Sequence, residues 1–420
     1  MKPLLLASIS LFCAASLCAQ PAPVALQPTE GYFVFGPATT LAADPELLPL
    51  AEYAAEYLGC DVEPSRTGAS AVVLTLEPGE PSEAFRLEIA PEYIRIGATA
   101  YGGAFNGLQA LFRLLPPEIY ARRGIPAGTT LACGTTDDAP RYAYRGMMID
   151  VARTWIEPTM LKRYIDLLSY HNINKLHLHL ADDEGWRLEI RSHPELAEVG
   201  GFRGGDSPVV AVYGKWSEKY GGYYTQEEMR RLIDYAARRN IEIIPEIDLP
   251  GHSRCIGSVH PEIRCDYPAD TASTGGTDYR SAWCVAREEN YALLDDILGE
   301  ICALFPSDCI HIGGDEVEVS QWTKCPHCRA LMRRLGIADP HRLQDRFMNR
   351  LTAMLAKRGK RPAVWDEAAA SGRFTRESRI HGWRSVESCL DATAKGYRTV
   401  VMPSECFYFD MRQSPREEGH

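Results

Sequence analysis

The feature that most constrains the fold is a regular alternation of short apolar segments with amphipathic segments, beginning near Tyr144. This alternation is typical of βα units that build a parallel sheet. One helical run opens with Thr225 and Glu228 at the spacing of a capping box. Seven strands are predicted, at 146–151, 175–180, 241–247, 309–312, 362–365, 380–383 and 399–402. The predicted fold class is therefore α/β, a (β/α)8 TIM barrel whose last unit is expected to be missing from this chain.

Residues 20–140 have a different pattern and are predicted to form a small α+β accessory domain. Strand-like stretches at 71–76 and 85–96 precede a helical pattern at 104–115 that could lie on a sheet. Because this part has no cluster of titratable residues, we predict a scaffold there. The catalytic barrel is predicted at 141–420 and is expected to be incomplete at its C-terminal end.

The first nineteen residues have the composition of a secretory signal peptide. Lys2 supplies a positive charge, residues 4–17 are nearly all apolar, and small residues follow up to Ala19. The apolar run is about 14 residues long, shorter than the roughly 20 that a membrane span needs, and no later segment approaches that length. We expect cleavage near Ala19 and a secreted or periplasmic protein. A lipid anchor on Cys18 is the weaker alternative, because bulky Leu17 precedes it.

Charge and cysteine content bound the partners and the compartment. The formal charge is −11, and no stripe of basic residues could neutralise phosphates, so nucleic acid is not an expected partner. Without Cys13 and Cys18, eleven cysteines remain, an odd number that suits an oxidising compartment. Cys325 and Cys328 form a CxxC pair. A disulfide or inert thiols are favoured there over zinc, because no second pair is nearby in the sequence.

The second predicted strand carries histidines at alternate positions. Alternation places His177 and His179 on one face, and Asp182 follows close to the strand end. Two interpretations stay open: imidazoles satisfied by buried carboxylates, or the metal ligands of an amidohydrolase. The second needs further histidines, for which only His252 and His311 are plausible, so we expect no metal in the site.

The third and fourth predicted strands end in turns that carry candidate catalytic groups. Pro250 and Gly251 force a turn that could aim His252 over the barrel mouth, where it could form a relay with Asp182. After the fourth strand come Gly313 and Gly314, followed by Asp315 and Glu316. The glycines permit the turn that brings both carboxylates into one site. Paired carboxylates in unequal environments are typical of glycoside cleavage, with one of them kept protonated.

Aromatic residues beside polar groups follow the later strands. Trp365, Trp383 and Tyr408 offer flat apolar surfaces, and Asp410 and Arg153 offer polar groups. A sugar ring has apolar C–H faces and hydroxyl edges, so this combination suits a pyranose.

On these residues the sequence closely resembles glycoside hydrolase family 20, the β-N-acetylhexosaminidases. The resemblance runs from about Phe85 to the last residue, and it includes that family's accessory α+β domain. The motifs that carry it are RGMMIDVAR at 145–153, HLHLADDEGWR at 177–187, PEIDLPGH at 245–252 and HIGGDE at 311–316.

The resemblance implies an exo-acting retaining β-N-acetylhexosaminidase that acts on N-acetylhexosamine-containing glycans and needs no cofactor. The substrate's own 2-acetamido oxygen would be the nucleophile. Glu316 would be the general acid/base, and Asp315 would hold the acetamido N–H. Tyr408, Arg153, Asp410 and His179 would bind substrate groups, Trp365 and Trp383 would wall the pocket, and Asp182 with His252 would support Glu316.

Two departures from the family pattern are Thr154-Trp155 after the arginine and Leu178 between the histidines. A third is that the chain ends at His420, before the strand that would bring a further pocket tryptophan. An inactive glycan-binding protein on the same fold remains the alternative, and the sequence makes no prediction of the oligomeric state.

Overall fold

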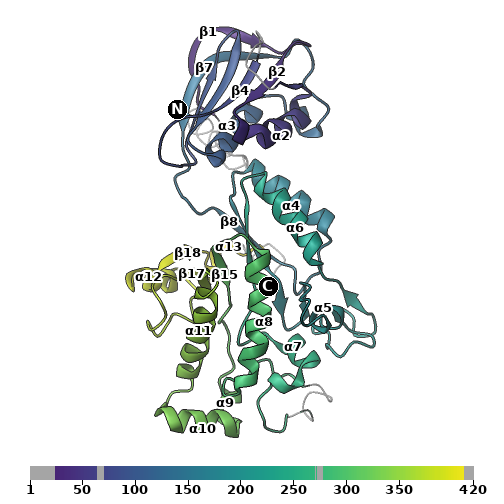
Figure 1. Ribbon diagram of the computed structural model, residues 1–420, viewed down its shortest axis with the longest axis vertical. Coiled ribbons are helices and arrows are strands. Elements are labelled where there is room, and N and C mark those ends of the chain that lie inside the picture. The colour runs from purple at the N-terminus through teal and green to yellow at the C-terminus, as the bar shows by residue number, and fades with distance from the viewer. Residues whose placement is uncertain (1–23, 64–70, 270, 272–277, 411–420) are drawn as a thin grey trace, which may run out of the picture. The chain divides into compact units, whose positions relative to one another are not determined.

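A computed structural model describes residues 24–63, 71–269, 271 and 278–410 (Figure 1). It divides into two compact units. One contains the described residues up to Arg145, together with 166–173 and 238–240, and the other contains the remainder. The predicted signal peptide and Cys18 lie outside the described residues. Within the described part, no helix has both the length and the apolar character needed to cross a membrane.

The first unit is built on a mixed seven-stranded sheet in the order β1-β7-β5-β6-β4-β2-β3. Helix α3 packs on this sheet through Leu108 and Leu111, which are fully buried. The strands are β1 (Gln27–Val34), β2 (Thr40–Ala43), β3 (Val62–Glu63), β4 (Ala71–Leu76), β5 (Phe85–Ile89), β6 (Tyr93–Ala98) and β7 (Thr130–Asp138). The helices are α2 (Leu48–Leu58), α3 (Tyr101–Leu114), η1 (Pro45–Leu47) and η2 (Pro117–Ala121).

The sequence analysis predicted two strands in this unit, at 71–76 and 85–96, and it missed β1, β2, β3 and β7. The stretch predicted as a single strand at 85–96 is an antiparallel hairpin of β5 and β6. Its turn contains Pro91, and the backbone N–H of Ala90 donates to the carbonyl of Tyr93 at 2.8 Å. Proline removes a ladder donor, so a strand cannot continue through it.

The second unit contains an all-parallel seven-stranded sheet in the order β18-β17-β16-β15-β14-β9-β8. Its strands follow one another in chain order, as in a TIM barrel, and each predicted strand is confirmed within two residues. They are β8 (Gly146–Asp150), β9 (Lys175–His179), β14 (Glu242–Glu246), β15 (Cys309–His311), β16 (Arg361–Trp365), β17 (Arg379–Gly382) and β18 (Arg398–Val401). With the accessory unit, this is the predicted TIM-barrel-like α/β fold.

Helices connect these strands and cover the sheet, with α6 against β14 and α11 against β16. Figure 1 shows α12 beside β17 and β18, which it contacts. The predicted capping box opens α6, where Thr225 Oγ1 accepts the backbone N–H of Glu228 at 3.1 Å. The helices are α4 (Pro158–Tyr170), α5 (Glu195–Glu198), α6 (Gln226–Ala237), α7 (Arg254–Val259), η3 (Pro261–Ile263), α8 (Glu288–Leu304), α9 (Ser320–Lys324), α10 (Pro326–Leu335), α11 (His341–Ala356), α12 (Val386–Ala394) and α13 (Ser404–Phe407).

Two small antiparallel ribbons lie in the connection that follows β9. They pair β10 (Ala181–Asp182) with β11 (Gly185–Trp186), and β12 (Phe202–Arg203) with β13 (Tyr220–Gly221). The first ribbon holds Asp182 directly beyond the carboxyl end of β9. The carboxyl ends of parallel strands meet at one edge of a sheet, so the residues that follow them are gathered there.

Candidate active site

Glu246, at the end of β14, is the centre of a buried polar cluster inside the barrel sheet. Its carboxylate oxygens lie 2.9 Å from His177 Nε2, 2.8 Å from His179 Nδ1 and 3.0 Å from His311 Nδ1. Trp365 donates its indole N–H to the same carboxylate at 2.7 Å. A charge this deeply buried is tolerated only when it is paired and hydrogen-bonded. Glu246 therefore fixes the orientation of four side chains from three other strands.

A chain of contacts runs from this cluster to the outer site. His179 Nε2 is hydrogen-bonded to Asp182 at 2.8 Å. Asp182 also lies 2.7 Å from the guanidinium of Arg153, which is bound in addition to Asp150 at 2.8 Å. Burial opposes ionisation of Asp182, but the hydrogen bonds from His179 and His252 outweigh it and hold its pKa well below the usual range. Asp182 is thus an ionised carboxylate that orients both basic groups.

His252 bridges two carboxylates, as the sequence analysis expected. Its Nδ1 lies 3.4 Å from Asp182, and its Nε2 lies 3.4 Å from Glu316. The backbone at His252 has φ of 43°, in the left-handed region. Burial lowers its pKa, but Asp182 and Glu316 outweigh burial and raise the pKa well above the usual range. The imidazole is therefore held protonated between an inner and an outer carboxylate.

Two glycines make the turn that brings Asp315 and Glu316 into one site. Gly313 has φ of 68° and Gly314 has φ of 101°. A Cβ on Gly313 would lie 1.7 Å from Asp248 Oδ1, so only glycine fits there. The turn directs Asp315 inward, whereas the Glu316 side chain is 58% exposed.

The two carboxylates of this pair have unequal environments. Burial raises the pKa of Asp315. The pKa of Asp248 is raised still more, by burial and by the neighbouring Asp315. Asp248 is therefore the carboxyl group that keeps a proton, which it can donate to Asp315 in a hydrogen bond. The hydrogen bond from His252 lowers the pKa of Glu316. The asymmetry that the sequence predicted is present, but the expected acid, Glu316, is the more easily ionised partner. The physical reason is that a protonated imidazole sits beside it.

The aromatic residues differ in how they meet this site. Trp365 is almost fully buried, because its indole is bound to Glu246. Trp383 is half-buried, and its ring stacks on Tyr408 with centroids 6.4 Å apart and an interplanar angle of 24°. Burial raises the pKa of Tyr408. The negative charges of Glu246, Asp315 and Asp410 raise this pKa further, so the Tyr408 hydroxyl is influenced by the same carboxylates as the rest of the site. Asp410 is exposed beyond α13.

The sequence analysis did not predict a functional role for several residues that the structure places in the site. Glu246 and Asp248 were noticed only as neighbours of His252, and Glu367, which accepts the backbone N–H of Glu316 at 2.8 Å, was not singled out as a site residue. His381 was also missed, although its ring lies 5.0 Å from that of His177. The available signal was a polar residue at the end of a predicted buried strand.

Three imidazoles of the barrel interior, those of His177, His311 and His381, lie close enough to share an ion. Burial lowers the pKa of His311 to about 4, so this imidazole is neutral at physiological pH. Glu246 already lies within 3.0 Å of both His177 and His311. Contacts with one carboxylate account for the positions of His177 and His311.

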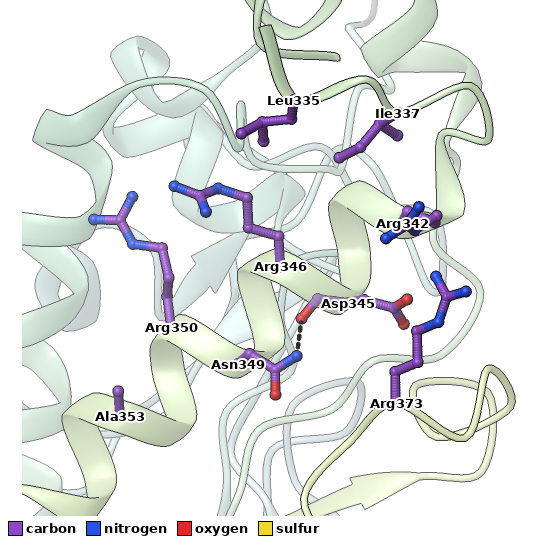
Figure 2. Close-up of a pocket in the computed structure, with 9 residues that line it drawn as sticks. All are labelled: Leu335, Ile337, Arg342, Asp345, Arg346, Asn349, Arg350, Ala353 and Arg373. Atoms are coloured by element: carbon purple, nitrogen blue, oxygen red, sulfur yellow. Dashed lines mark hydrogen bonds between the residues drawn. The ribbon is translucent and has the colours of Figure 1, made fainter.

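A separate pocket of about 530 Å³ lies along α11 and contains none of the predicted site residues. Figure 2 shows that its polar lining is mainly arginine, with Arg373 reaching in from the connection after β16. Asn349 donates to the backbone carbonyl of Asp345 there at 2.8 Å. It lacks the paired carboxylates and tryptophans of the strand ends, which are the better candidate for chemistry.

A parallel barrel sheet that gathers buried carboxylates, histidines and tryptophans at its carboxyl edge defines a TIM-barrel-like α/β protein, the class whose functional residues sit at strand ends. Residues 142–420 match the catalytic domain of glycosyl hydrolase family 20, and residues 20–139 match domain 2 of that family. The chain belongs to glycosyl hydrolase family 20. This membership confirms the resemblance and sets aside the amidohydrolase interpretation.

Curated relatives and solved structures agree with this assignment. A β-hexosaminidase of Vibrio furnissii is 34% identical over 417 residues, which cover 97% of this chain and 66% of the relative. A β-hexosaminidase of Akkermansia muciniphila is 32% identical, covering 87% of this chain and 73% of the relative. The crystal structure of an exo β-N-acetylglucosaminidase from Vibrio harveyi in complex with N-acetylglucosamine has a TM-score of 0.84 at 34% identity and covers 96% of this chain and 63% of that one. The chain spans between 45% and 73% of the length of the curated relatives.

Proposed function

We propose that this chain carries the activity of an exo-acting retaining β-N-acetylhexosaminidase, which releases terminal N-acetylglucosamine or N-acetylgalactosamine. The observation that carries this proposal is the pair Asp315 and Glu316, turned into one site by two glycines and backed by His252. Family membership and the names of the relatives support it.

In the proposed mechanism Glu316 protonates the leaving oxygen and later activates water. Its lowered pKa means that it needs a proton source, and His252 Nε2 is 3.4 Å away with a raised pKa. A bound sugar would cover the exposed carboxylate, and the loss of water would raise its pKa. The proton shared by this pair can then reside on Glu316 when the glycosidic bond breaks.

Asp315 is proposed to hold the acetamido N–H while the acetamido oxygen attacks the anomeric carbon. Burial raises the pKa of Asp315, and the hydrogen bond from Asp248 offsets part of that rise. The positive charge that develops on the substrate would favour ionised Asp315, which can then stabilise that charge. No protein carboxylate becomes glycosylated in this scheme. A covalent sugar trapped on any Asp or Glu would contradict it.

The remaining residues are proposed to bind the sugar. Arg153, fixed by Asp150 and Asp182, and the exposed Asp410 can bond outer hydroxyls. Tyr408 can donate to the acetamido oxygen. The pocket walls are proposed to be Trp365 and Trp383. His179 was expected to bind substrate, but it is buried with its two ring nitrogens against Glu246 and Asp182. Its proposed role is therefore to support the site through Asp182.

The deciding experiment compares an aryl β-N-acetylglucosaminide with the matching aryl β-glucoside. We expect turnover of the first and none of the second, because only the first carries the acetamido nucleophile. Turnover of both would point to a protein nucleophile. Binding of N-acetylglucosamine without turnover of either would support the inactive glycan-binding alternative.

We also propose, from Lys2 and the apolar run that follows it, that the protein is exported as a secreted or periplasmic enzyme. N-terminal sequencing of the protein isolated from culture tests this. An intact Met1 on the mature protein would contradict export with cleavage near Ala19.

A further inference from the structure

The CxxC pair and two cysteines distant from it in the sequence meet in the second unit. Cys265 follows η3, Cys284 precedes α8, Cys325 lies between α9 and α10, and Cys328 is in α10. All four are buried, and their Sγ atoms all lie within 4.8 Å of one another. The sequence analysis favoured a disulfide or inert thiols at Cys325 and Cys328 because no second pair was near. The fold supplies that second pair.

The separations between these sulfur atoms match those of a tetrahedral metal site. Cys284 Sγ lies 3.6 Å from Cys328 Sγ and 3.9 Å from Cys325 Sγ, and Cys265 Sγ lies 3.9 Å from Cys328 Sγ. Four sulfurs bound to zinc at about 2.3 Å stand about 3.8 Å apart when the geometry is tetrahedral. Sulfurs joined in a disulfide are only about 2.05 Å apart. The arrangement therefore has the spacing of four ligands around one ion.

The surroundings hold the sulfur atoms in place and exclude water. Trp283 and Trp322 are fully buried beside the cluster, and the Trp322 indole donates to the carbonyl of Trp283 at 2.9 Å. Arg280 donates to the carbonyl of Cys265 at 2.8 Å. A closed site with no open coordination position is typical of structural zinc, in contrast to a catalytic site.

Backbone N–H groups point at two of the four sulfur atoms. The N–H of Ala286 is hydrogen-bonded to Cys284, and the N–H of Cys328 is hydrogen-bonded to Cys325. Backbone N–H groups that point at ligand sulfurs are a common outer shell of metal sites.

We propose that Cys265, Cys284, Cys325 and Cys328 bind one structural zinc ion. Each thiol loses its proton when Zn²⁺ binds, so four protons are released and the site carries a net charge of −2. No oxidation or reduction takes place. Cysteine thiolates are the ligands that zinc prefers in sites of this closed kind.

The ion would join the two connections that carry catalytic groups. The connection after β14 contains His252 and provides Cys265 and Cys284, and the connection after β15 contains Glu316 and provides Cys325 and Cys328. The backbone N–H of Cys284 donates to the carbonyl of Ile263 at 2.7 Å, which holds Cys284 close to the segment that carries Cys265. The proposed zinc ion cross-links these two connections and fixes their relative positions, and it takes no part in the chemical step.

The first test measures metal and thiols in the full chain, purified without added zinc. Elemental analysis should find one zinc ion per chain, and mass spectrometry of the unreduced protein should find these four cysteines as thiols. Replacement of zinc by Co²⁺ should give the intense visible absorption of a tetrahedral tetrathiolate centre. Disulfides among the four cysteines, or a chain that contains no zinc and takes up no Co²⁺, would overturn the proposal.

The second test uses matched variants. Cys325→Ser should lose the zinc ion and melt at a lower temperature, whereas Cys302→Ser, which alters a buried cysteine of α8 outside the cluster, should keep its zinc. Cys325→His should restore zinc binding, because a Cys3His set also binds zinc. Equal zinc content in Cys325→Ser and the unaltered protein would contradict the assignment. If Cys325→Ser does not fold, the cobalt spectrum of the unaltered protein still decides the question.

Discussion

The chain contains two seven-stranded sheets whose interiors are built on opposite principles. The mixed sheet of the first unit buries apolar side chains such as Leu87 and Ile96 against α3. The parallel sheet of the second unit buries a carboxylate and four histidines, with Glu246 at their centre. Burying polar groups costs free energy, and pairing and hydrogen bonding offset that cost. The second sheet therefore stabilises the fold less than an apolar interior would, but it fixes the positions of charged groups. The proposed active site lies on this second sheet.

Replacing Glu316 should have the largest effect and should fall on activity alone. Glu316→Gln is expected to lower kcat/KM on natural glycosides by about 10²–10⁴, the worth of a positioned general acid. The loss should be smaller for an aryl leaving group, which departs without a proton. Glu318→Gln, an exposed carboxylate two residues away, is the control and should change kcat/KM little. Equal losses on both substrate types would count against Glu316 as the acid.

Removing the central carboxylate should mainly reduce stability. Glu246→Ala leaves His179, whose pKa is raised despite burial, without its main counter-charge, and a broken buried pair costs roughly 3–5 kcal/mol. Urea unfolding measures this free energy. On the same strand Glu242 pairs with Lys175 at a partly exposed position, so Glu242→Ala should cost about 0–1 kcal/mol. A similar small loss for both variants would show that the buried cluster is not stabilising.

A cavity in the apolar sheet should reduce stability without changing the chemistry. Leu87→Ala removes a fully buried side chain of β5 and is expected to cost about 2–5 kcal/mol. Its kcat/KM per folded molecule should equal that of the unaltered protein, because the first unit holds no proposed catalytic group. A tenfold loss of kcat/KM under native conditions would show that the first unit also contributes to catalysis.

The smallest expected effect is the dependence of stability on pH, which the charged groups that follow the strands of the second unit should dominate. His252 has a raised pKa when folded, so its contribution is complete below about pH 6.5 and is lost as pH rises. Asp182 has a lowered pKa, so its contribution is complete above about pH 4 and is lost in acid. Stability should therefore be greatest between about pH 4 and 6.5.

Urea midpoints across this range test the pH argument. His252→Gln should flatten the decline above pH 6.5, by about 1.4 kcal/mol for each unit by which the pKa is raised. His327→Gln, at an exposed position, is the control. A decline that is unchanged in His252→Gln would assign the pH dependence to other groups.

Much of the barrel could be predicted from local pattern, whereas much of the first unit could not. The seven parallel strands were predicted because short, mainly apolar runs alternate with helical segments. Strands β1, β2, β3 and β7 were missed. Two of these, β2 and β3, are only four and two residues long, and runs so short carry little periodic signal. The turn at Pro91 was also missed, because the stretch 85–96 was predicted as a single strand.

The candidate site shows the same division. Motifs at the strand ends named Asp315, Glu316, His252 and Asp182, and the structure brings all four together. The direction of the Glu316 pKa could not be predicted, since it depends on an imidazole that is distant in the sequence.

The sequence by itself determined the order of the elements, the glycine turn before Asp315 and the identity of the polar groups, because these depend on local residue patterns. Only the tertiary structure decided that Glu246 is shared by three histidines and that Cys265 and Cys284 meet Cys325 and Cys328. Burial, charge pairing and the distance between sulfur atoms depend on segments that are far apart in the chain. Such contacts exist only once the sheet has assembled.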